Sequence, residues 1–208
     1  DTTSDVSEGE IGETVLHVMK KRVPEFINAH GRKAWDSAVS ATTRSKPIFT
    51  KQPPHVISRA FFKMREITLS CSLHSPLHSL HLGEAPGGFV QATAQFAKPG
   101  WTWHAVSLEG EAAIRPMTEH LPQGGSFMSG LPEHGDMLSN ECRAAINGRV
   151  GWECDLITAD GAVEMNHDRL EESHLELLFS QTDVALANLK TGGEFLCKFF
   201  EGNLYRTK

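Results

Sequence analysis

The chain has 208 residues, of which 39% are hydrophobic, and a formal net charge of −6. This length and composition fit one globular domain with a core of its own, and the acidic balance excludes a protein that coats nucleic acid by charge alone. Without an apolar stretch of about 18 residues or a signal-peptide pattern, we expect no membrane association. The four cysteines show no C-x-x-C spacing, so we expect a reducing, intracellular compartment: the cytoplasm, the nucleus or a viral replication site.

The first 54 residues are expected to form a helical extension and a linker, ahead of a main domain at 55–208. Hydrophobic residues recur near helical spacing between Ile11 and Ala29, whereas residues 42–54 are rich in Thr, Ser, Lys and Pro. Basic residues are concentrated between residues 20 and 65. This leaves open either a face for an anionic polymer or an ordinary solvated helical surface.

From residue 56 onward the hydrophobic pattern alternates between helical and strand-like segments. Helices are expected at 56–69, 89–97, 138–147 and 170–189, and strands at 79–82, 101–108, 126–129, 155–159 and 195–200. Gly192 and Gly193 are expected to end the last helix. Such alternation predicts an α/β fold with a mostly parallel sheet and helices on both faces. Ligands of such sheets bind at the carboxyl ends of the strands.

A glycine-rich loop lies between the first predicted strand and the helix that follows it. The loop consists of Gly83, Glu84, Ala85, Pro86, Gly87, Gly88 and Phe89. Glycines let the backbone turn tightly and approach a ligand, and a helix N-terminus offers unpaired N–H groups. The spacing is not G-x-G-x-x-G, and Glu84 would repel a pyrophosphate, so the loop favours S-adenosylmethionine, a cation with an amino acid moiety, over a dinucleotide. A purely structural turn between strand and helix is the alternative.

Two further acids follow later strands of the predicted sheet. Glu109 follows the second strand, where a carboxylate can accept hydrogen bonds from both hydroxyls of a ribose. Asp136 lies in the loop after the third strand, where a side chain can bind the amino group of adenine. Either acid alone is more simply a solvated surface carboxylate. Together with Glu84, they stand in register with successive strand ends and favour a cofactor site.

Four motifs surround this site in the order and spacing of a known family. They are Ser58–Ile67, Leu80–Phe89, Asp155–Gly161 and Gly192–Phe200. Together they resemble the FtsJ-like RNA ribose 2′-O-methyltransferases, and the E-A-P-G-G-F loop and the A-D-G segment are more similar to the mRNA-cap branch, cellular or viral, than to the ribosomal RNA branch. The resemblance implies a Rossmann-like S-adenosylmethionine-dependent methyltransferase fold, S-adenosylmethionine as cofactor, and RNA, the 5′ end of capped mRNA, as partner.

The resemblance also implies a catalytic tetrad of Lys, Asp, Lys and Glu. Lys63, Asp160 and Lys198 match its first three positions. The fourth residue of the family lies on a later strand, and Glu201 is too close in sequence to Lys198 to match it. We therefore expect the C-terminal strands of the fold, together with the fourth acid, to be missing from this sequence.

Methyl transfer from a sulfonium to a ribose hydroxyl is an in-line displacement that needs alignment and the removal of one proton. A lysine removes that proton only in its neutral form, which burial and a second lysine nearby both favour. The resemblance thus implies Lys198 as the base, and Asp160 as the residue that orients it and attracts the positive charge of the methyl donor. Lys63 tunes the site and, with Arg59 and Lys198, contacts RNA. This mechanism requires no metal ion.

Three alternatives stay open at this point. A methyltransferase-like module without the fourth acid would bind RNA or cofactor without catalysis. A nicotinamide-dependent oxidoreductase would share the sheet, although Glu84 and the absent G-x-G-x-x-G spacing argue against it. The substrate would be ribosomal RNA instead of capped mRNA in the third alternative. Further protein domains or capping partners also stay open.

Overall fold

The computed structural model describes residues 27–31, 33, 34, 37, 53–162 and 170–198. The chain divides into two compact units, residues 1–51 and 52–208. In the first unit, residues 27–30 are helical. The earlier part of the helix expected from residue 11, and residues 42–52 of the expected linker, lie outside the described residues. The domain boundary at residue 54 stays a prediction. No helix of the described ranges is long and apolar enough to cross a membrane.

Five parallel strands form the sheet of the second unit, in the order β3-β2-β1-β4-β5. The strands are β1 (His78–Leu82), β2 (Thr102–Val106), β3 (Gly125–Phe127), β4 (Cys154–Ala159) and β5 (Leu189–Cys197). The helices are α3 (Arg59–Cys71), α4 (Gly88–Thr93), α5 (Asn140–Val150) and α6 (Leu170–Asn188), with short 3-10 helices η1 (Thr118–His120) and η2 (Pro132–Gly135). The predicted α/β fold is confirmed.

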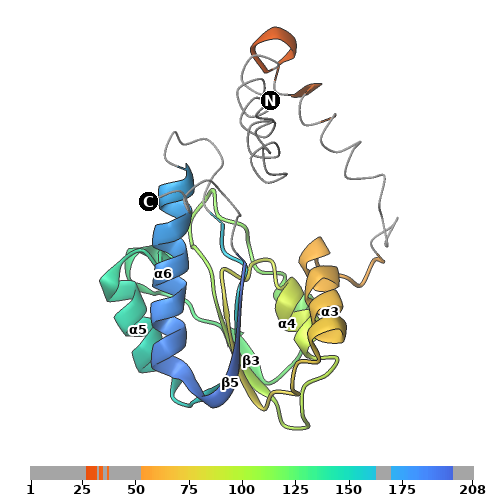
Figure 1. Cartoon of the computed structure of the whole chain (residues 1–208), viewed down its shortest axis with the longest axis vertical. Coiled ribbons are helices and arrows are strands. Elements are labelled where there is room, and N and C mark those ends of the chain that lie inside the picture. The colour runs from red at the N-terminus through yellow and green to blue at the C-terminus, as the bar shows by residue number, and fades with distance from the viewer. Residues whose placement is uncertain (1–26, 32, 35–36, 38–52, 163–169, 199–208) are drawn as a thin grey trace, which may run out of the picture. The chain divides into compact units, whose positions relative to one another are not determined.

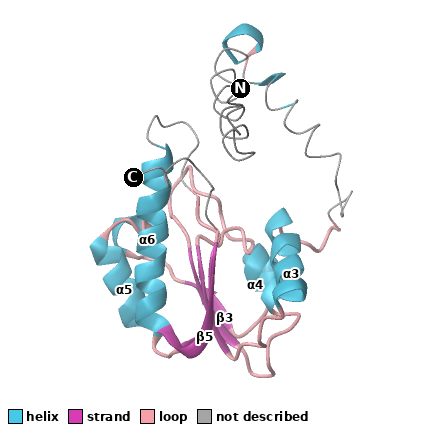
Figure 2. Ribbon diagram, viewed as in Figure 1, coloured by secondary structure: helices cyan, strands magenta, loops and turns pink. Residues whose placement is uncertain are grey.

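Helices cover both faces of the sheet, with α5 and α6 on one face and α3 and α4 on the other (Figure 1, Figure 2). The alternation of side chains along β1 explains this arrangement. Leu80 and Leu82 are fully buried in the core on the α5–α6 side. Ser79 and His81 therefore point to the opposite face, where His81 bonds Ser79 Oγ at 2.9 Å and Thr158 Oγ1 at 2.8 Å. These bonds satisfy an imidazole that is fully buried.

The start of β5 differs from the prediction. Helix α6 ends at Asn188, and Gly192 and Gly193 lie inside β5, so the prediction that they end the helix was wrong. The pairing of β5 with β4 shifts its register between Cys154 and Leu156. Gly192 has a φ of +79°, and a Cβ on Gly193 would lie 3.0 Å from the carbonyl oxygen of Cys154. The two glycines therefore permit a bulge where β5 approaches β4 closely.

The register of the sheet brings four strand ends to one edge. Leu82, the last residue of β1, lies opposite Val106 of β2 and Ala159 of β4, and Ala159 lies opposite the last residue of β5. The amide of Asp160 donates to the carbonyl of Leu82 at 3.1 Å, and that of Lys198 to the carbonyl of Ala159 at 2.8 Å. The residues that follow the four strands are consequently neighbours: Gly83, Ser107, Asp160 and Lys198.

Candidate active site

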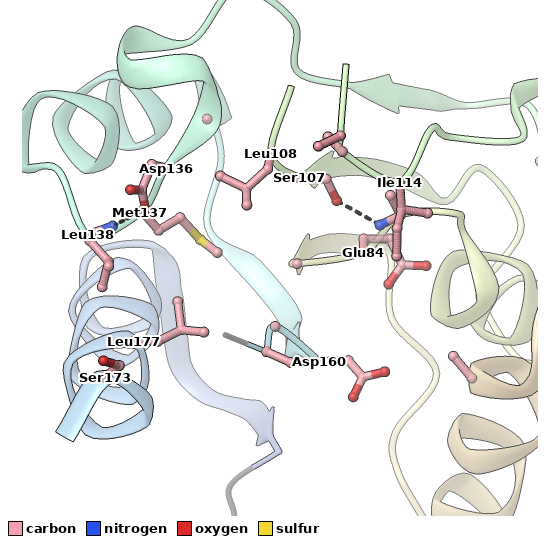
Figure 3. A pocket seen from close by; sticks show the side chains of 18 residues that line it. Glu84, Ser107, Leu108, Ile114, Asp136, Met137, Leu138, Asp160, Ser173 and Leu177 are labelled. Atoms are coloured by element: carbon pink, nitrogen blue, oxygen red, sulfur yellow. Dashed lines mark hydrogen bonds between the residues drawn. The ribbon is translucent and has the colours of Figure 1, made fainter. Parts of the chain in front are cut away.

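A cavity of about 680 Å³ opens at this edge of the sheet (Figure 3). Small-molecule sites in proteins span about 300–1,000 Å³, so the volume suits a cofactor. Residues from the loops that follow β1, β2, β3 and β4, and from α3 and α6, line it: Ala60, Gly83, Glu84, Ala85, Ser107, Leu108, Ala112, Ala113, Ile114, Gly135, Asp136, Met137, Leu138, Asp160, Gly161, Ala162, Ser173 and Leu177. Five of the predicted cofactor residues are among them: Gly83, Glu84, Ala85, Asp136 and Asp160.

The glycine-rich loop leaves β1 through Gly83, which has a φ of +66°. A Cβ at this position would lie 2.4 Å from the Cα of Gly161. Any other residue would therefore collide with the backbone that follows β4, in addition to the strain of a left-handed conformation. Next in the loop, the amide of Ala85 donates a hydrogen bond to Ser107 Oγ at 2.6 Å. These contacts hold the loop against the ends of β2 and β4.

The second half of the loop packs against the surrounding core. A Cβ on Gly87 would lie 2.6 Å from a methyl carbon of Leu121, and one on Gly88 would lie 2.3 Å from Ser58 Oγ just before α3. Phe89 is buried in the core that α3 and α4 share. Residues 86–89 thus shape the loop but do not line the cavity. Their contact with a cofactor stays a prediction.

Glu84 is the buried acid of the loop, with 4% of its surface exposed. Its Oε1 accepts a hydrogen bond from the amide of Val90, in the first turn of α4, at 2.9 Å. Burial raises the pKa of Glu84 to about 8, against the lowering effect of the amides of Val90 and Phe89, and the negative charge of Asp160 raises it further. The side chain therefore fixes the start of α4 and presents to the cavity an acid that is mostly protonated at neutral pH.

Three charged side chains meet at the end of β4. Lys198 Nζ lies 2.9 Å from Asp160 Oδ1 and donates a hydrogen bond to the carbonyl oxygen of Asp160 at 2.7 Å. Lys63 Nζ of α3 lies 3.6 Å from the other carboxylate oxygen, Oδ2. The side chain of Lys63 is 55% exposed, compared with 14% for Asp160 and 28% for Lys198. One carboxylate thus holds a sheltered and an exposed lysine, and Arg59 lies exposed one turn earlier on α3.

The two acids predicted to bind a nucleoside are placed differently. Asp136 lines the cavity, and its Oδ1 accepts a hydrogen bond from the amide of Leu138 at 2.9 Å. Glu109 does not line the cavity, and its carboxylate accepts a hydrogen bond from the amide of Gly130 at 3.0 Å. Glu109 as a ribose ligand stays a prediction. Sequence reasoning missed Ser107 because β2 was expected to run beyond it, whereas the strand ends one residue before it.

The sequence of this chain is similar to those of known proteins. The family model described as FtsJ-like methyltransferase matches residues 56–207, which is most of the chain. The chain belongs to the FtsJ-like methyltransferase family. AdoMet-dependent rRNA methyltransferase spb1 of Schizosaccharomyces pombe is 28% identical to this FtsJ-like chain over 152 residues, which are 71% of the chain and 17% of that protein. Cap-specific mRNA (nucleoside-2′-O-)-methyltransferase 2 of Drosophila melanogaster is 28% identical over 148 residues, 60% of the chain and 21% of that protein.

The FtsJ-like chain therefore spans 17% and 21% of the length of these two relatives. Its fold is shared with the solved structure of a ribosomal RNA methyltransferase from Plasmodium falciparum, with a TM-score of 0.53 and 16% identity over 72% of this chain and 81% of that one. At this identity the likeness shows the fold alone. The family predicted from four sequence motifs is confirmed, and with it the methyltransferase class in place of an oxidoreductase.

Proposed function

We propose that this FtsJ-like methyltransferase transfers a methyl group from S-adenosylmethionine to the 2′-hydroxyl of an RNA ribose. The observation that carries the proposal is the contact of Lys63 and Lys198 with the two oxygens of the Asp160 carboxylate, beside a cavity that Asp160 itself lines. This arrangement places a lysine, which in its neutral form can accept a proton, next to the space for a small cofactor. The names of the fission yeast and fly relatives state RNA as their substrate.

The residues that line the cavity fit S-adenosylmethionine. Figure 3 shows Glu84 and Asp160 across the cavity from Asp136. The apolar side chain of Met137 lies beside Asp136, and that of Leu108 lies between Asp136 and Glu84. The Asp160 carboxylate suits the cationic amino acid end of this cofactor, and the mostly protonated Glu84 beside it offers hydrogen bonds. Apolar walls with a carboxylate suit an adenine with its amino group. When bound, S-adenosylmethionine supplies a methyl group on a sulfonium, which is a good leaving group.

In the proposed reaction the ribose hydroxyl would exchange its proton, which Lys198 Nζ would accept, for the methyl group that the bound cofactor would supply. Asp160 fixes the position of Nζ through its carboxylate and its carbonyl oxygen, so the acceptor is aligned before the reaction. Lys63 is more exposed, and together with Arg59 it can contact the hydroxyl or the phosphates of an RNA.

For the substrate we propose the 5′ end of a capped mRNA, methylated inside the cell. The loop from Glu84 to Phe89 and the segment from Ala159 to Gly161 support this choice by their similarity to the cap branch, and the fly relative is named for cap specificity. Ribosomal RNA, the substrate in the name of the fission yeast relative, is the alternative. The basic residues on α3 suit either RNA.

The test is methyl transfer from tritiated S-adenosylmethionine to capped and uncapped RNA of one sequence, followed by nuclease digestion and nucleoside analysis. We expect labelled 2′-O-methyl nucleoside from capped RNA. Label on a base would contradict the ribose target, and equal labelling of uncapped RNA would contradict only the cap. Asp160→Asn keeps the shape of the side chain but removes the charge that holds both lysines. We expect the methyl-transfer rate of this variant to fall at least about a hundredfold.

A further inference from the structure

Arg143 of α5 reaches the back of one cavity wall. Its side chain is only 16% exposed. Its Nη1 donates hydrogen bonds to the carbonyl oxygens of Met137 at 2.7 Å and Leu138 at 2.9 Å. Both of these residues line the cavity, and Figure 3 shows them on the side opposite Glu84. One guanidinium thus holds two consecutive peptide groups of this wall.

The same guanidinium is anchored on the neighbouring helix α6. Its Nε donates to Asp183 Oδ2 at 3.2 Å, and Nη1 also lies 3.3 Å from Ser180 Oγ. Helix α6 itself contributes Ser173 and Leu177 to the cavity. Arg143 therefore connects two segments that form the same side of the cavity. A planar guanidinium with several donors does this in a fixed geometry, which the single nitrogen of a lysine cannot reproduce.

Asp136 depends on this arrangement. The amide of Leu138 donates to Asp136 Oδ1 at 2.9 Å, while the carbonyl of Leu138 accepts from Arg143. Both backbone groups of Leu138 are therefore held, one by the predicted adenine ligand and one by the arginine. A displacement of Leu138 would also release the Asp136 carboxylate from the position that it has in the cavity.

We propose that Arg143 is a positioning residue for the cofactor. By holding the carbonyl groups of Met137 and Leu138, it sets the position of the wall and of Asp136, and thereby the affinity for the nucleoside end of S-adenosylmethionine. This inference rests on the proposed function. It assigns to Arg143 no contact with the cofactor or with the reacting atoms.

Arg149 of the same helix is a matched control. Its Nη1 and Nη2 donate to the carbonyl oxygens of Ser129 at 2.7 Å and Gly130 at 3.0 Å. Neither of these two residues lines the cavity, and neither does Glu109, whose carboxylate accepts a hydrogen bond from the amide of Gly130. Arg143 and Arg149 thus each hold two consecutive loop carbonyls from α5. They differ in whether the loop that they hold forms the cavity.

The experiment is calorimetric titration of the full chain with S-adenosylhomocysteine, combined with melting temperatures and steady-state kinetics. Arg143→Met is expected to weaken binding about tenfold, which corresponds to the loss of one charge-assisted hydrogen bond. The KM for the methyl donor should rise, with a smaller change in kcat, because the reacting groups lie elsewhere. Arg149→Met is expected to bind as tightly as the wild type, even where it melts earlier, because neither the loop that it holds nor Glu109, which accepts a hydrogen bond from that loop, lines the cavity.

Equal affinities of Arg143→Met and Arg149→Met would overturn the inference. Asp183→Asn keeps the test decisive where Arg143→Met does not fold, because Asp183 is 69% exposed and its substitution spares the core. We expect this variant to weaken binding about twofold, the size of an exposed ion pair, and an unchanged affinity would then count against the inference. Failure of the wild type to bind S-adenosylhomocysteine would instead overturn the proposed function.

Discussion

Two lysine–aspartate pairs join the same two strands, one at each edge of the sheet. At the carboxyl edge, Lys198 follows β5 and pairs with Asp160, which follows β4. At the amino edge, Lys190 near the start of β5 pairs with Asp155 near the start of β4. The two aspartates are equally sheltered, with 14% and 15% of their side chains exposed. The pairs differ in what else each carboxylate binds.

The carboxylate of Asp155 is occupied on both oxygens. Oδ2 accepts hydrogen bonds from the amides of Leu77 and His78, each at 2.8 Å, and Oδ1 accepts from Lys190. Burial raises the pKa of Asp155, but the hydrogen bonds from Lys190, His78 and Leu77 outweigh this effect and hold it at about 2. Asp160 instead shares its oxygens between two lysines beside a cavity. A carboxylate saturated by backbone amides joins strands, whereas one shared by two cations at a strand end is placed for chemistry.

The largest expected effect is the loss of methyl transfer in Lys198→Met. Lys198 is the proposed proton acceptor, so we expect the single-turnover rate to fall about a thousandfold, within the range of general base catalysis. Binding of S-adenosylhomocysteine should be retained. Lys190→Met is the matched control, because it makes the same substitution in the other pair, and its rate should stay close to that of the wild type. A comparable loss of rate in folded Lys190→Met would remove the distinction between the two pairs.

Glu84 is a third acid to compare with Asp155 and Asp160. It accepts a hydrogen bond from a backbone amide, as Asp155 does, but it has no lysine partner among the described contacts and it is buried. Its pKa of about 8 in the folded protein lies above its ordinary value of 4.5. The stability that this group contributes is therefore fully present below about pH 4.5 and is lost as the pH rises through about 8. We expect the unfolding free energy of the wild type, relative to Glu84→Gln, to fall by about 1 kcal/mol per pH unit across this range.

Urea denaturation at a series of pH values measures this difference. His81 acts in the opposite direction, because burial lowers its pKa to about 3. Its contribution is present above about pH 6.5 and is lost as the pH falls towards 3. Both proteins contain His81, so its effect cancels in the difference between them. A difference that stays flat or rises with pH would show that Glu84 is not held in its protonated form.

Asp155→Ala is expected to lower the unfolding free energy by about 2 kcal/mol, because two amides and Lys190 lose their acceptor. Asp160→Ala should cost about 1 kcal/mol or less, since both lysines are partly exposed and Lys198 keeps its hydrogen bond to the backbone carbonyl of residue 160. The effects on methyl transfer should have the reverse order. Because the folded pKa of Asp155 lies below 3.8, its contribution is present above about pH 4 and is lost as the pH falls through about 2. Urea denaturation at pH values from neutral to acid checks both points.

One of the two lysine–aspartate pairs could be predicted from the sequence, and the other could not. Asp160 follows the strand expected at 155–159, and Lys198 lies in the second half of the strand expected at 195–200. The ends of parallel strands meet at one edge, so their proximity was predictable. Lys63 was assigned by its family motif. Asp155 and Lys190 lie near strand starts and were not predicted to pair. Their contact depends on the register between β4 and β5, which hydrophobic patterns do not contain.

Other differences between prediction and structure also arise from strand ends and backbone contacts, which hydrophobic patterns do not specify. Glu109 was placed at a strand end because β2 was expected to run to residue 108, but the strand ends at Val106. Glycine pairs are typical both of helix ends and of bulges, and only the approach of Gly193 to the carbonyl of Cys154 distinguishes the two. The contacts of Arg143 with backbone carbonyls have no signature in the sequence, because any residue provides such an acceptor.

Gly193→Ala has the smallest expected effect, and it tests whether the bulge keeps the two pairs independent. The new Cβ would lie 2.9 Å from Leu189 Cδ1 and 3.0 and 3.1 Å from the carbonyl oxygens of Cys154 and Asp155. These neighbours must shift slightly, so we expect a loss of about 1 kcal/mol in unfolding free energy. The shift falls beside Asp155, before β5 reaches Lys198, and the rate of methyl transfer should therefore not change. A lower rate in the folded variant would mean that strain at the amino edge travels along β5 to the proposed base.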